Sequence, residues 1–269
     1  MQLIDGKALL LRLRNPSRVT KTIPNSVQVN QHEVKVNLGI DEAHTLKDLG
    51  IKSPSPIETR YQWSGKHKPF AHQKTTAAFL TMNRKAFCFN EQGTGKTASA
   101  IWAADFLMKQ NKVQRVLVIC PLSIMDSAWR SDLDAFAPHR SVDIAHGTPT
   151  KRRAIVEQGA DFVIINYDGV KIVADSIAAG NFDLIIVDEA THYKNAQSKR
   201  WKTLNKLIHD KTWLWLMTGT PAAQSPLDAY GLAKLVNPNT VPRFFGSFRD
   251  MVMVNITQFR WIVKDTASD

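Results

Sequence analysis

The sequence predicts an α/β fold, a parallel sheet covered by helices on both faces, preceded by a small β-rich extension. The chain has 269 residues, 43% hydrophobic and 22% charged, so it can bury a core and is neither disordered nor fibrous. From residue 86 onward, short apolar runs alternate with amphipathic stretches, which is typical of a parallel α/β sheet. Before residue 66, apolar residues alternate singly with polar ones, the period of a small exposed sheet.

Each strand of the predicted parallel sheet is an apolar run of four or five residues. Such runs are too short for helices and, being apolar on both faces, suit strands that helices cover on both sides. The runs occupy residues 86–89, 116–119, 162–165, 184–187 and 213–217. Helix-like segments lie between them, including residues 97–108 and 124–136.

The first 66 residues are predicted to form a smaller unit with its own sheet. The alternation of apolar and polar residues includes Leu11 and Leu13 and continues over residues 27–38. A short helix is expected over residues 41–49, ended by Gly50.

Composition narrows the classes of function. Lys and Arg number 35 against 24 Asp and Glu, and the net charge of +11 is compatible with a polyanionic partner. Cys88 and Cys120 lie inside apolar runs, where a thiol behaves as a small hydrophobe, so a reducing compartment is expected. No apolar run approaches the length of a signal peptide or a membrane span. We expect a soluble, cytoplasmic protein with no membrane partner and, because the histidines lack metal-ligand spacing, no zinc.

A glycine-bearing loop, NEQGTGKT over Asn90–Thr97, joins the first predicted core strand to a helix. A helix N-terminus directs backbone N–H groups and a positive dipole end at one point, as a nucleotide's phosphates require. Lys96 would reach the β- and γ-phosphates, and Thr97 would offer its hydroxyl to Mg²⁺. Asn90 stands where the pattern GxxxxGK[ST] has its first glycine, and an ordinary strand-to-helix turn is the alternative. The predicted cofactor-binding residues here are Gln92, Gly93, Thr94, Gly95, Lys96 and Thr97.

Two acidic residues, Asp188 and Glu189, follow the buried run FDLIIV. The carboxyl end of that strand should lie beside the phosphate-binding loop, so Asp188 can hold Mg²⁺ and Glu189 can activate the attacking water. With Lys96 they form the predicted catalytic set, and a solvated strand end is the alternative. The earlier pair Asp41 and Glu42 also precedes alanine, but is better explained as the N-cap and first turn of a helix.

With these motifs in order, the chain resembles the Swi/Snf-like branch of superfamily-two helicases and translocases from about residue 68 to 248. NEQGTGKT is similar to the first motif of that family, which usually reads DEMGLGKT. VLVICPLSIMDSAWRSDL resembles the next motif, a strand and turn followed by a helix carrying a tryptophan. INYDGV resembles the strand-end motif that approaches the tracking DNA strand. The resemblance implies DNA contacts at Pro121, Leu122, Ser123, Asn166 and Tyr167.

Further segments extend the resemblance. DEATHYKN is similar to DEAH-x-x-KN, with Thr191 in place of the usual histidine and His192 one position later, while Lys194 and Asn195 match and are implied to contact DNA. TGTPAAQSPLDAYGL resembles the third motif, with Gln224 at the asparagine position. In the family, Thr191, Thr218 and Thr220 would couple hydrolysis to movement. KPFAHQKTTAAFL resembles the adenine-reading segment, with Gln73 as its glutamine and the usual arginine absent.

A basic stripe follows the acidic motif. Lys199, Lys202 and Lys206 are spaced three and four apart, so they would share one helical face while apolar residues of 201–208 cover another. Such a face can neutralise DNA phosphates without reading sequence, and a solvated surface is the alternative. The run Lys151–Arg153 is interpreted as solvated only.

The resemblance implies the N-terminal RecA-like lobe of a DNA-dependent ATPase of phage or bacterial type, with ATP and Mg²⁺ as cofactors and DNA as partner. We assign residues 1–52 to the extension, 53–66 to a linker, 67–242 to the ATP-binding lobe and 243–269 to the start of an inter-lobe connector. Only 49 residues follow Thr220, too few for a second RecA-like lobe, so we expect an isolated chain with almost no turnover. A non-catalytic nucleotide- or DNA-binding module and an unrelated P-loop phosphotransferase remain as alternatives.

Overall fold

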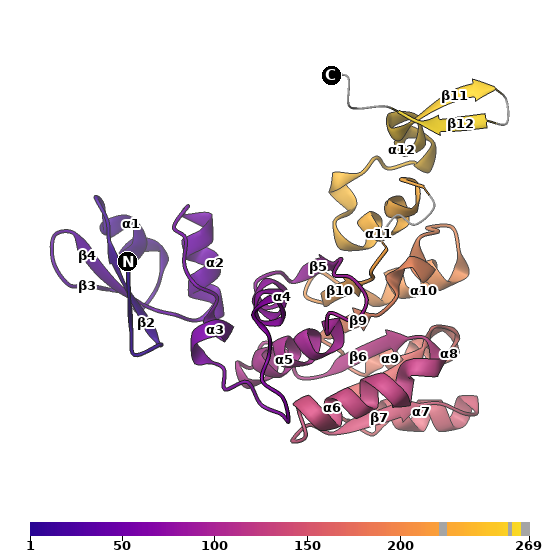
Figure 1. Ribbon diagram of the computed structural model, residues 1–269, viewed down its shortest axis with the longest axis horizontal. Helices are drawn as coiled ribbons and strands as arrows, with labels where there is room; N and C mark the ends of the chain where they lie inside the picture. The colour runs from indigo at the N-terminus through magenta and orange to yellow at the C-terminus, as the bar shows by residue number, and fades with distance from the viewer. Residues whose placement is uncertain (221–224, 258–259, 265–269) are drawn as a thin grey trace.

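The N-terminal unit of the computed structural model, which describes residues 1–220, 225–257 and 260–264, is built around an antiparallel sheet (Figure 1). The strand order within these residues is β1-β2-β4-β3. The strands are β1 (Gln2–Ile4), β2 (Ala8–Arg12), β3 (Val27–Gln28) and β4 (Glu33–Asn37). Alternate residues of β2 and β4, among them Leu9, Leu11, Val34 and Val36, are buried against helices α1 (Ser17–Thr22) and α2 (Ile40–Asp48). The predicted N-terminal sheet is confirmed, whereas α1 was not predicted.

Helix α2 tests the interpretation of the first acidic pair. Asp41 and Glu42 lie in its first turn, as expected, but Gly39 and not an acidic residue is the N-cap. Asp41 instead forms an ion pair with Lys112 across the boundary between the two units. This first Asp-Glu-Ala is therefore part of the scaffold.

The larger unit contains the predicted parallel sheet. Within the described residues its strand order is β5-β10-β9-β6-β8-β7, and every neighbouring pair is parallel. The strands are β5 (Lys85–Cys88), β6 (Val116–Cys120), β7 (Val142–Ala145), β8 (Phe162–Asn166), β9 (Leu184–Val187) and β10 (Trp213–Met217). All the apolar runs expected to be strands are strands; β7, at the edge, was not predicted.

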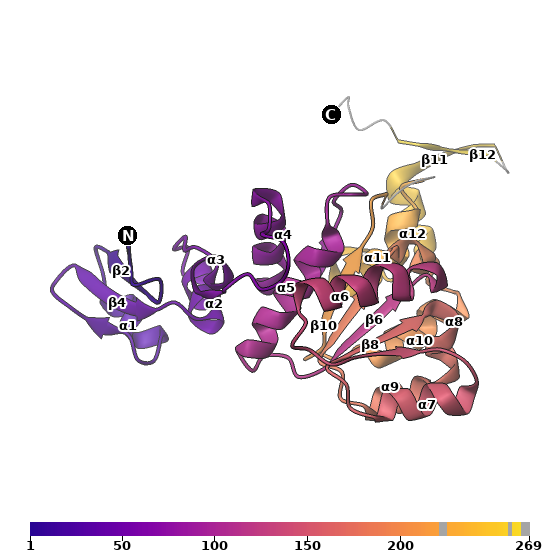
Figure 2. The ribbon, with the colours of Figure 1, turned by 60° about the horizontal axis from the view of Figure 1, so that its bottom comes forward.

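Helices cover both faces of this sheet, as predicted (Figure 2). One face packs against α4 (Ala71–Thr81), α5 (Lys96–Lys109) and α6 (Ser131–Phe136). The other packs against α7 (Pro149–Glu157), α8 (Tyr167–Ile172), α9 (Ala174–Ala179), α10 (Lys199–Leu207) and α11 (Asp228–Val236). Short 3₁₀ turns occur at Ala190–Tyr193 and Pro238–Thr240.

The segment expected as one helix over residues 124–136 has three parts. A 3₁₀ turn at Leu122–Ile124 leads into a π-helix at Met125–Arg130, and α6 continues from Ser131. π-helical turns are rare and occur frequently at functional sites, because the wider turn redirects a side chain.

The C-terminal segment extends away from the sheet (Figures 1 and 2). It consists of α12 (Phe245–Val252) and the hairpin β11 (Met253–Thr257) and β12 (Arg260–Val263). Nowhere in the described part of the chain is there a helix with the length and apolar character needed to cross a membrane.

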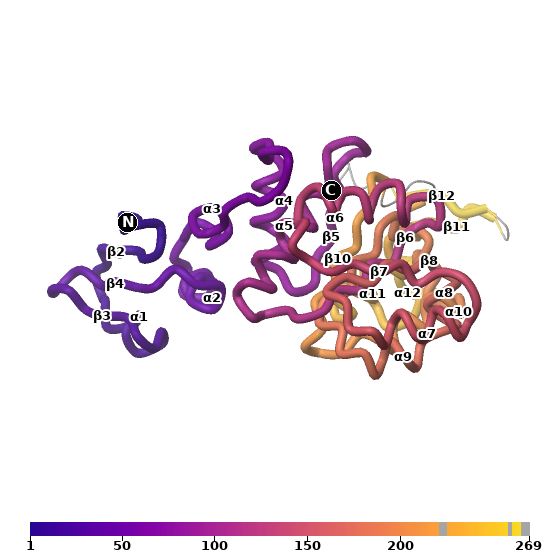
Figure 3. Tube along the Cα trace, turned by 90° about the horizontal axis from the view of Figure 1, so that it is seen from below, coloured from indigo at the N-terminus to yellow at the C-terminus, as the bar shows by residue number. Residues whose placement is uncertain are grey.

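The N-terminal unit lies at one end of the molecule, and the segment between α2 and α4, residues 49–70, connects it to the larger one (Figure 3). Helix α3 (Pro56–Arg60) lies within this connection. His44 Nε2 contacts the Met82 carbonyl of the larger unit (2.9 Å), and Arg60 Nη1 of the connection donates to the Leu38 carbonyl of the N-terminal unit (2.9 Å).

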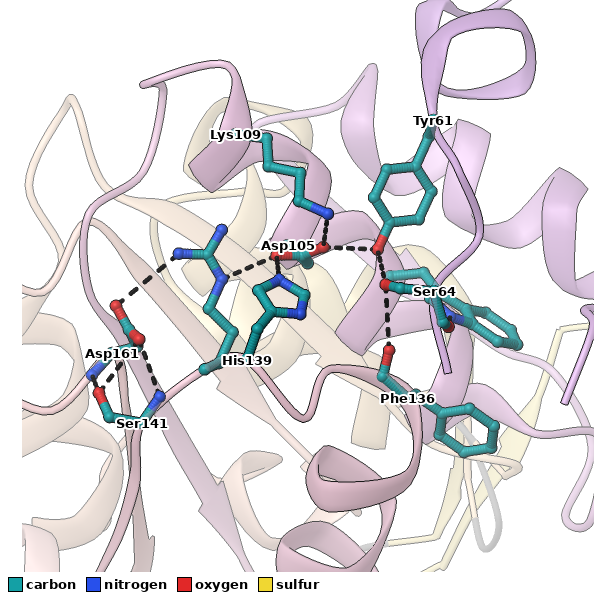
Figure 4. A network of polar contacts seen from close by, with 10 residues as sticks. Tyr61, Ser64, Asp105, Lys109, Phe136, His139, Ser141 and Asp161 are labelled. Carbon is teal, nitrogen blue, oxygen red and sulfur yellow. Dashed lines mark hydrogen bonds and ion pairs between the residues drawn. The ribbon is translucent and has the colours of Figure 1, made fainter. Parts of the chain in front are cut away.

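A network around the buried carboxylate of Asp105 in α5 fastens this connection to the larger unit (Figure 4). Tyr61 donates its hydroxyl to Oδ2 at 2.6 Å, and Lys109 Nζ lies 2.9 Å from the same oxygen. His139 Nε2 and Arg140 Nε lie 2.8 and 2.7 Å from Oδ1. Burial alone would raise the pKa of Asp105, but the hydrogen bonds from these side chains lower it to about 2.

Candidate nucleotide site

The strand register brings the predicted loop and the predicted acidic pair to the same edge of the sheet. Phe87 of β5 is level with Leu216 of β10, and Leu216 is level with Val187 of β9. Because all three strands are parallel, their carboxyl ends meet at one edge of the sheet. β10 lies between β5 and β9, so these two strands are about 10 Å apart. The chain leaves β5 into the glycine-bearing loop and leaves β9 into Asp188.

Two glycines give the loop its shape. Gly93 and Gly95 have φ values of +76° and +75°, in the left-handed region that favours glycine. Gly95 is the N-cap of α5, and a Cβ there would overlap the Gln73 side chain. A glycine-bearing turn that opens directly into a buried helix fits the phosphates of a nucleotide.

Lys96, the first residue of α5, folds back over this loop. Its Nζ donates to the Asn90 carbonyl at 2.8 Å and the Glu91 carbonyl at 2.9 Å. Asn90, at the position expected for a glycine, donates Nδ2 to Thr76 Oγ1 at 2.7 Å and so ties the loop to α4. Thr97 follows, half-buried in the first turn of α5. The ammonium and hydroxyl predicted to meet phosphate and Mg²⁺ thus come from the same helical turn.

The predicted adenine-reading glutamine also contacts the loop. Gln73 Oε1 accepts a hydrogen bond from the Phe70 amide at 3.0 Å, and its Nε2 donates to the Thr94 carbonyl at 3.4 Å. His72 Nε2 lies 3.0 Å from the same carbonyl, a contact the sequence did not indicate. Gln92 is exposed at the tip of the loop.

Asp188 and Glu189 have contrasting surroundings. Asp188 is 8% exposed, and its carboxylate accepts hydrogen bonds from Trp129 Nε1 and the Glu189 amide, both at 3.0 Å. Burial raises the pKa of Asp188, while these hydrogen bonds and the nearby charge of Lys96 act in the opposite direction. Glu189 has a left-handed backbone (φ +48°), and its half-exposed carboxylate makes no hydrogen bond or ion pair among the described residues.

The turn after β10 lies against the phosphate-binding loop. Thr218 is buried, and its amide donates to the Cys88 carbonyl at 3.1 Å, while its hydroxyl accepts from the Thr220 amide at 3.2 Å. A Cβ built on Gly219 would lie 3.4 Å from Gln92 Cγ. Thr218 and Thr220, two of the three predicted coupling threonines, therefore belong to the turn beside the loop; Gln224 lies outside the described residues.

The segments predicted to contact DNA follow β6 and β8 at the same edge. Leu122 and Ser123 are exposed, with Leu122 at 56%, and Pro121 is partly buried. Asn166 Oδ1 accepts a hydrogen bond from Arg152 Nη1 at 2.8 Å. Arg152 is 7% exposed, so the interpretation of this arginine as solvated was wrong: its guanidinium also donates to the carbonyls of Ala145, the last residue of β7, and of Gly147 just after it.

Tyr167 connects this edge to the acidic pair. Its hydroxyl donates to the Asp188 carbonyl at 2.7 Å, and the His192 ring lies 4.5 Å from the Tyr167 ring. A cavity of about 390 Å³ beside them is lined by Lys171, His192 and Arg200, among others. His192, one position after the expected histidine, therefore faces the predicted DNA side, while Thr191 is half-buried in the 3₁₀ turn.

The remaining predicted DNA residues belong to the segment from Lys194 through α10. Lys194 forms an ion pair with Asp228 (3.1 Å), and Asn195 is exposed. Lys199, Lys202 and Lys206 are all exposed, whereas Leu204 of α10 is fully buried. The two predicted faces of α10 are present. Among the described residues, no cluster of three or more His, Cys, Asp and Glu side chains could hold a metal ion.

Residues 72–267 match the family model of the SNF2-related domain. The chain belongs to this family. The predicted membership of the Swi/Snf-like helicase and translocase family is confirmed.

Curated relatives resemble this SNF2-related chain over part of their length. The "SWI/SNF-related matrix-associated actin-dependent regulator of chromatin subfamily A-like protein 1" of Xenopus laevis is 30% identical over 156 residues, 58% of this chain and 15% of the relative. "Nuclear protein STH1/NPS1" of Saccharomyces cerevisiae is 24% identical over 260 residues, 87% of this chain and 18% of the relative. "Uncharacterized ATP-dependent helicase YqhH" of Bacillus subtilis is 26% identical over 174 residues, 63% of this chain and 29% of the relative. The chain spans less than a third of each.

A solved structure confirms the fold. The "Sulfolobus solfataricus SWI2/SNF2 ATPase core in complex with dsDNA" matches with a TM-score of 0.62 and 24% identity, over 70% of this chain and 39% of that one. The parallel sheet of this SNF2-related chain is thus a RecA-like lobe, as predicted.

Proposed function

We propose that this chain is the ATP-binding lobe of a DNA-dependent ATPase that moves along or remodels DNA. The observation that carries the proposal is the meeting of the phosphate-binding loop and the Asp188–Glu189 pair at one edge of the sheet. Family membership supports it, as does the solved relative, whose title names an ATPase core and double-stranded DNA.

The chain's own residues divide the work on the nucleotide. The amides of residues 92–95 and the Lys96 ammonium bind phosphate oxygens once Lys96 leaves the loop carbonyls, and Gln73 reads the adenine. Thr97 and Asp188 would hold Mg²⁺, which neutralises charge on the phosphates when bound. The Glu189 carboxylate, which has no hydrogen-bond or ion-pair partner among the described residues, accepts a proton from the attacking water.

We assign DNA binding to residues that contact the DNA backbone, and the coupling of ATP hydrolysis to movement to three threonines. The DNA-contacting residues are Pro121, Leu122, Ser123, Asn166, Tyr167, Lys194, Asn195 and Lys199. The coupling residues are Thr191, Thr218 and Thr220. Contacts of this type neutralise phosphates and do not read base sequence, so binding should weaken as salt rises.

We further propose that a second RecA-like lobe completes the ATPase site. The SWI2/SNF2 core that this chain matches is aligned over 39% of its own length, which supports a larger functional unit. ATP binding would then belong to this chain, and rapid hydrolysis to the completed site.

Two substitutions test the proposal on the whole chain. Binding of a fluorescent ATP analogue should be lost in Lys96→Ala and retained in Lys211→Ala, a matched change before β10 at the opposite edge of the sheet. Glu189→Gln should retain ATP binding and abolish DNA-stimulated turnover in the presence of an added second lobe.

The alternatives give different results. Equal DNA affinity with and without ATP, unchanged in Lys96→Ala, would identify a non-catalytic DNA-binding module. Transfer of phosphate to a small molecule would identify a phosphotransferase. Retained turnover in Glu189→Gln would remove Glu189 from its assigned role.

A further inference from the structure

The Asp188 carboxylate is oriented by a residue from the segment that follows β6. Trp129 Nε1 donates to Asp188 Oδ2 at 3.0 Å, while the Glu189 amide donates to Oδ1. Trp129 is fully buried. An indole can donate one hydrogen bond and accept none, and a buried donor without a partner is costly, so this bond fixes the rotation of the carboxylate.

The backbone of Asp188 is fixed separately. The Asp188 amide donates to the Ile119 carbonyl at 2.8 Å, and the Tyr167 hydroxyl donates to the Asp188 carbonyl at 2.7 Å. Trp129 packs in the core on one face of the sheet and Tyr167 in the core on the other. Because these contacts already hold the main chain, the Trp129 bond acts on the side chain.

Trp129 also belongs to the segment that begins with the exposed 3₁₀ turn at Leu122–Ile124. Within it, the Ile124 amide donates to the Pro121 carbonyl at 3.2 Å, and Ser127 Oγ donates to the Ser123 carbonyl at 2.9 Å. The π-helix Met125–Arg130 then carries the chain to Trp129. A contact at the turn is therefore linked by hydrogen bonds and continuous helix to the indole on Asp188.

We infer that Trp129 is a positioning residue that holds the Asp188 carboxylate for Mg²⁺ and transmits DNA contact at the Leu122–Ile124 turn to it. The inference rests on the proposed function, since it assumes that Asp188 holds Mg²⁺ beside a bound nucleotide. The roles proposed above for the phosphate-binding loop and the acidic pair do not depend on this inference. Residues that orient a metal ligand from outside commonly change metal affinity when replaced.

The test compares two tryptophan substitutions in the 269-residue chain. Trp129→Phe removes the N–H and keeps an aromatic ring. Trp102→Phe is the matched control, because Trp102 is also buried and donates Nε1 to a backbone carbonyl, that of Ser64, at 2.8 Å. Affinity for a fluorescent ATP analogue is measured over a Mg²⁺ series, with and without duplex DNA.

In Trp129→Phe we expect a rise of about tenfold in the Mg²⁺ concentration that gives half of the maximal increase in nucleotide affinity. Nucleotide affinity without Mg²⁺ should equal that of the wild type. Duplex DNA should lower the Mg²⁺ requirement of the wild type and of Trp102→Phe but not that of Trp129→Phe. A merely structural role would weaken nucleotide binding equally with and without Mg²⁺.

A second measurement uses the wild type alone, so it does not depend on the folding of a variant. The indole N–H resonance of Trp129 should shift when Mg²⁺ is added to the nucleotide-bound chain, and again with duplex DNA. A resonance that moves with neither, or an unchanged Mg²⁺ requirement in Trp129→Phe, overturns the inference and leaves the proposed function intact. Absence of Mg²⁺-dependent nucleotide binding in the wild type overturns both.

Discussion

Asp105 and Asp188 are buried aspartates of the same lobe with opposite surroundings. Asp105 is fully buried and bonded by Tyr61 and the basic side chains around it, and its pKa falls to about 2. Asp188 accepts hydrogen bonds from the Trp129 indole and one amide, and burial raises its pKa. The first carboxylate is compensated by the protein, whereas the second has no bonded cation among the described residues.

The difference separates a stabilising site from a binding site. Cations and a phenol within bonding distance offset the desolvation of Asp105, so its charge supports the folded state. Asp188 keeps the cost of burial, which a divalent cation would offset. A buried carboxylate at a strand end with few donors is thus a stronger pointer to a ligand than one enclosed by basic side chains.

The largest expected effect comes from removing the compensated charge. Asp105→Ala should lower the free energy of unfolding by about 3–5 kcal/mol, because it leaves the buried Tyr61 hydroxyl and the largely buried Arg140 guanidinium without their acceptor. Urea unfolding measures this loss. Asp41→Ala, which removes an exposed ion pair with Lys112, should cost about 1 kcal/mol or less. Similar losses in the two variants would contradict the assigned role of Asp105.

The next effect is a pH dependence. Since folding lowers the pKa of Asp105, its stabilisation is complete above the unfolded pKa, about 4, and is lost as the pH falls toward 2. The shift corresponds to about 2 kcal/mol. The gap in unfolding free energy between wild type and Asp105→Asn should therefore narrow across that range. A gap that is constant with pH would show that the carboxylate's charge does not stabilise the fold.

A smaller effect tests the junction between the units. Tyr61→Phe removes the 2.6 Å hydrogen bond to Asp105 but leaves the basic partners in place. We expect a loss of about 1.5 kcal/mol in unfolding free energy, measured by urea titration. The variant should leave nucleotide affinity unchanged, because Tyr61 lies outside the phosphate-binding loop. A stability equal to that of the wild type would place the strength of the network in its ion pairs alone.

The smallest effect has the opposite sign. Asp188→Asn should raise the unfolding free energy by about 1 kcal/mol, because the gain from removing a buried charge exceeds the loss of one of the two hydrogen bonds that the Asp188 carboxylate accepts. The same variant should lose the Mg²⁺ dependence of nucleotide binding. Thermal unfolding and nucleotide titration measure the two results. Lower stability in Asp188→Asn would make the two aspartates alike and remove the contrast.

Much of the fold could be predicted because it depends on local pattern. Buried parallel strands are short and apolar on both faces, which identified β9 and β10 directly. The edge strand β7 was not predicted because its sequence, VDIA, contains an aspartate and is not a continuous apolar run. As an edge strand it pairs with β8 alone. The π-helix was not predicted because, over so few residues, the spacing of apolar side chains does not distinguish a π-helix from an α-helix.

For the candidate site, the positions of the main residues could be predicted from the sequence, but their hydrogen-bond partners could not. Lys96, Asp188 and Glu189 follow strands that the pattern located, so their common edge could be anticipated. The hydrogen bonds that orient them join positions far apart, such as Trp129 to Asp188, 59 residues apart in sequence. Arg152 lay in a basic run that resembled solvated surface, and only the tertiary fold shows it bonded to Asn166.

Strand β10 pairs with β5 on one side and β9 on the other, and so it alone spaces the loop from the acidic pair within the described sheet. One inserted residue would shift its register by about 3.3 Å and turn its side chains to the opposite faces. Natural length variation in proteins of this design should therefore concentrate in surface turns such as that at Gly147 and spare Trp213–Met217. The length and register of β10 thus set the distance between the phosphate-binding loop and the acidic pair.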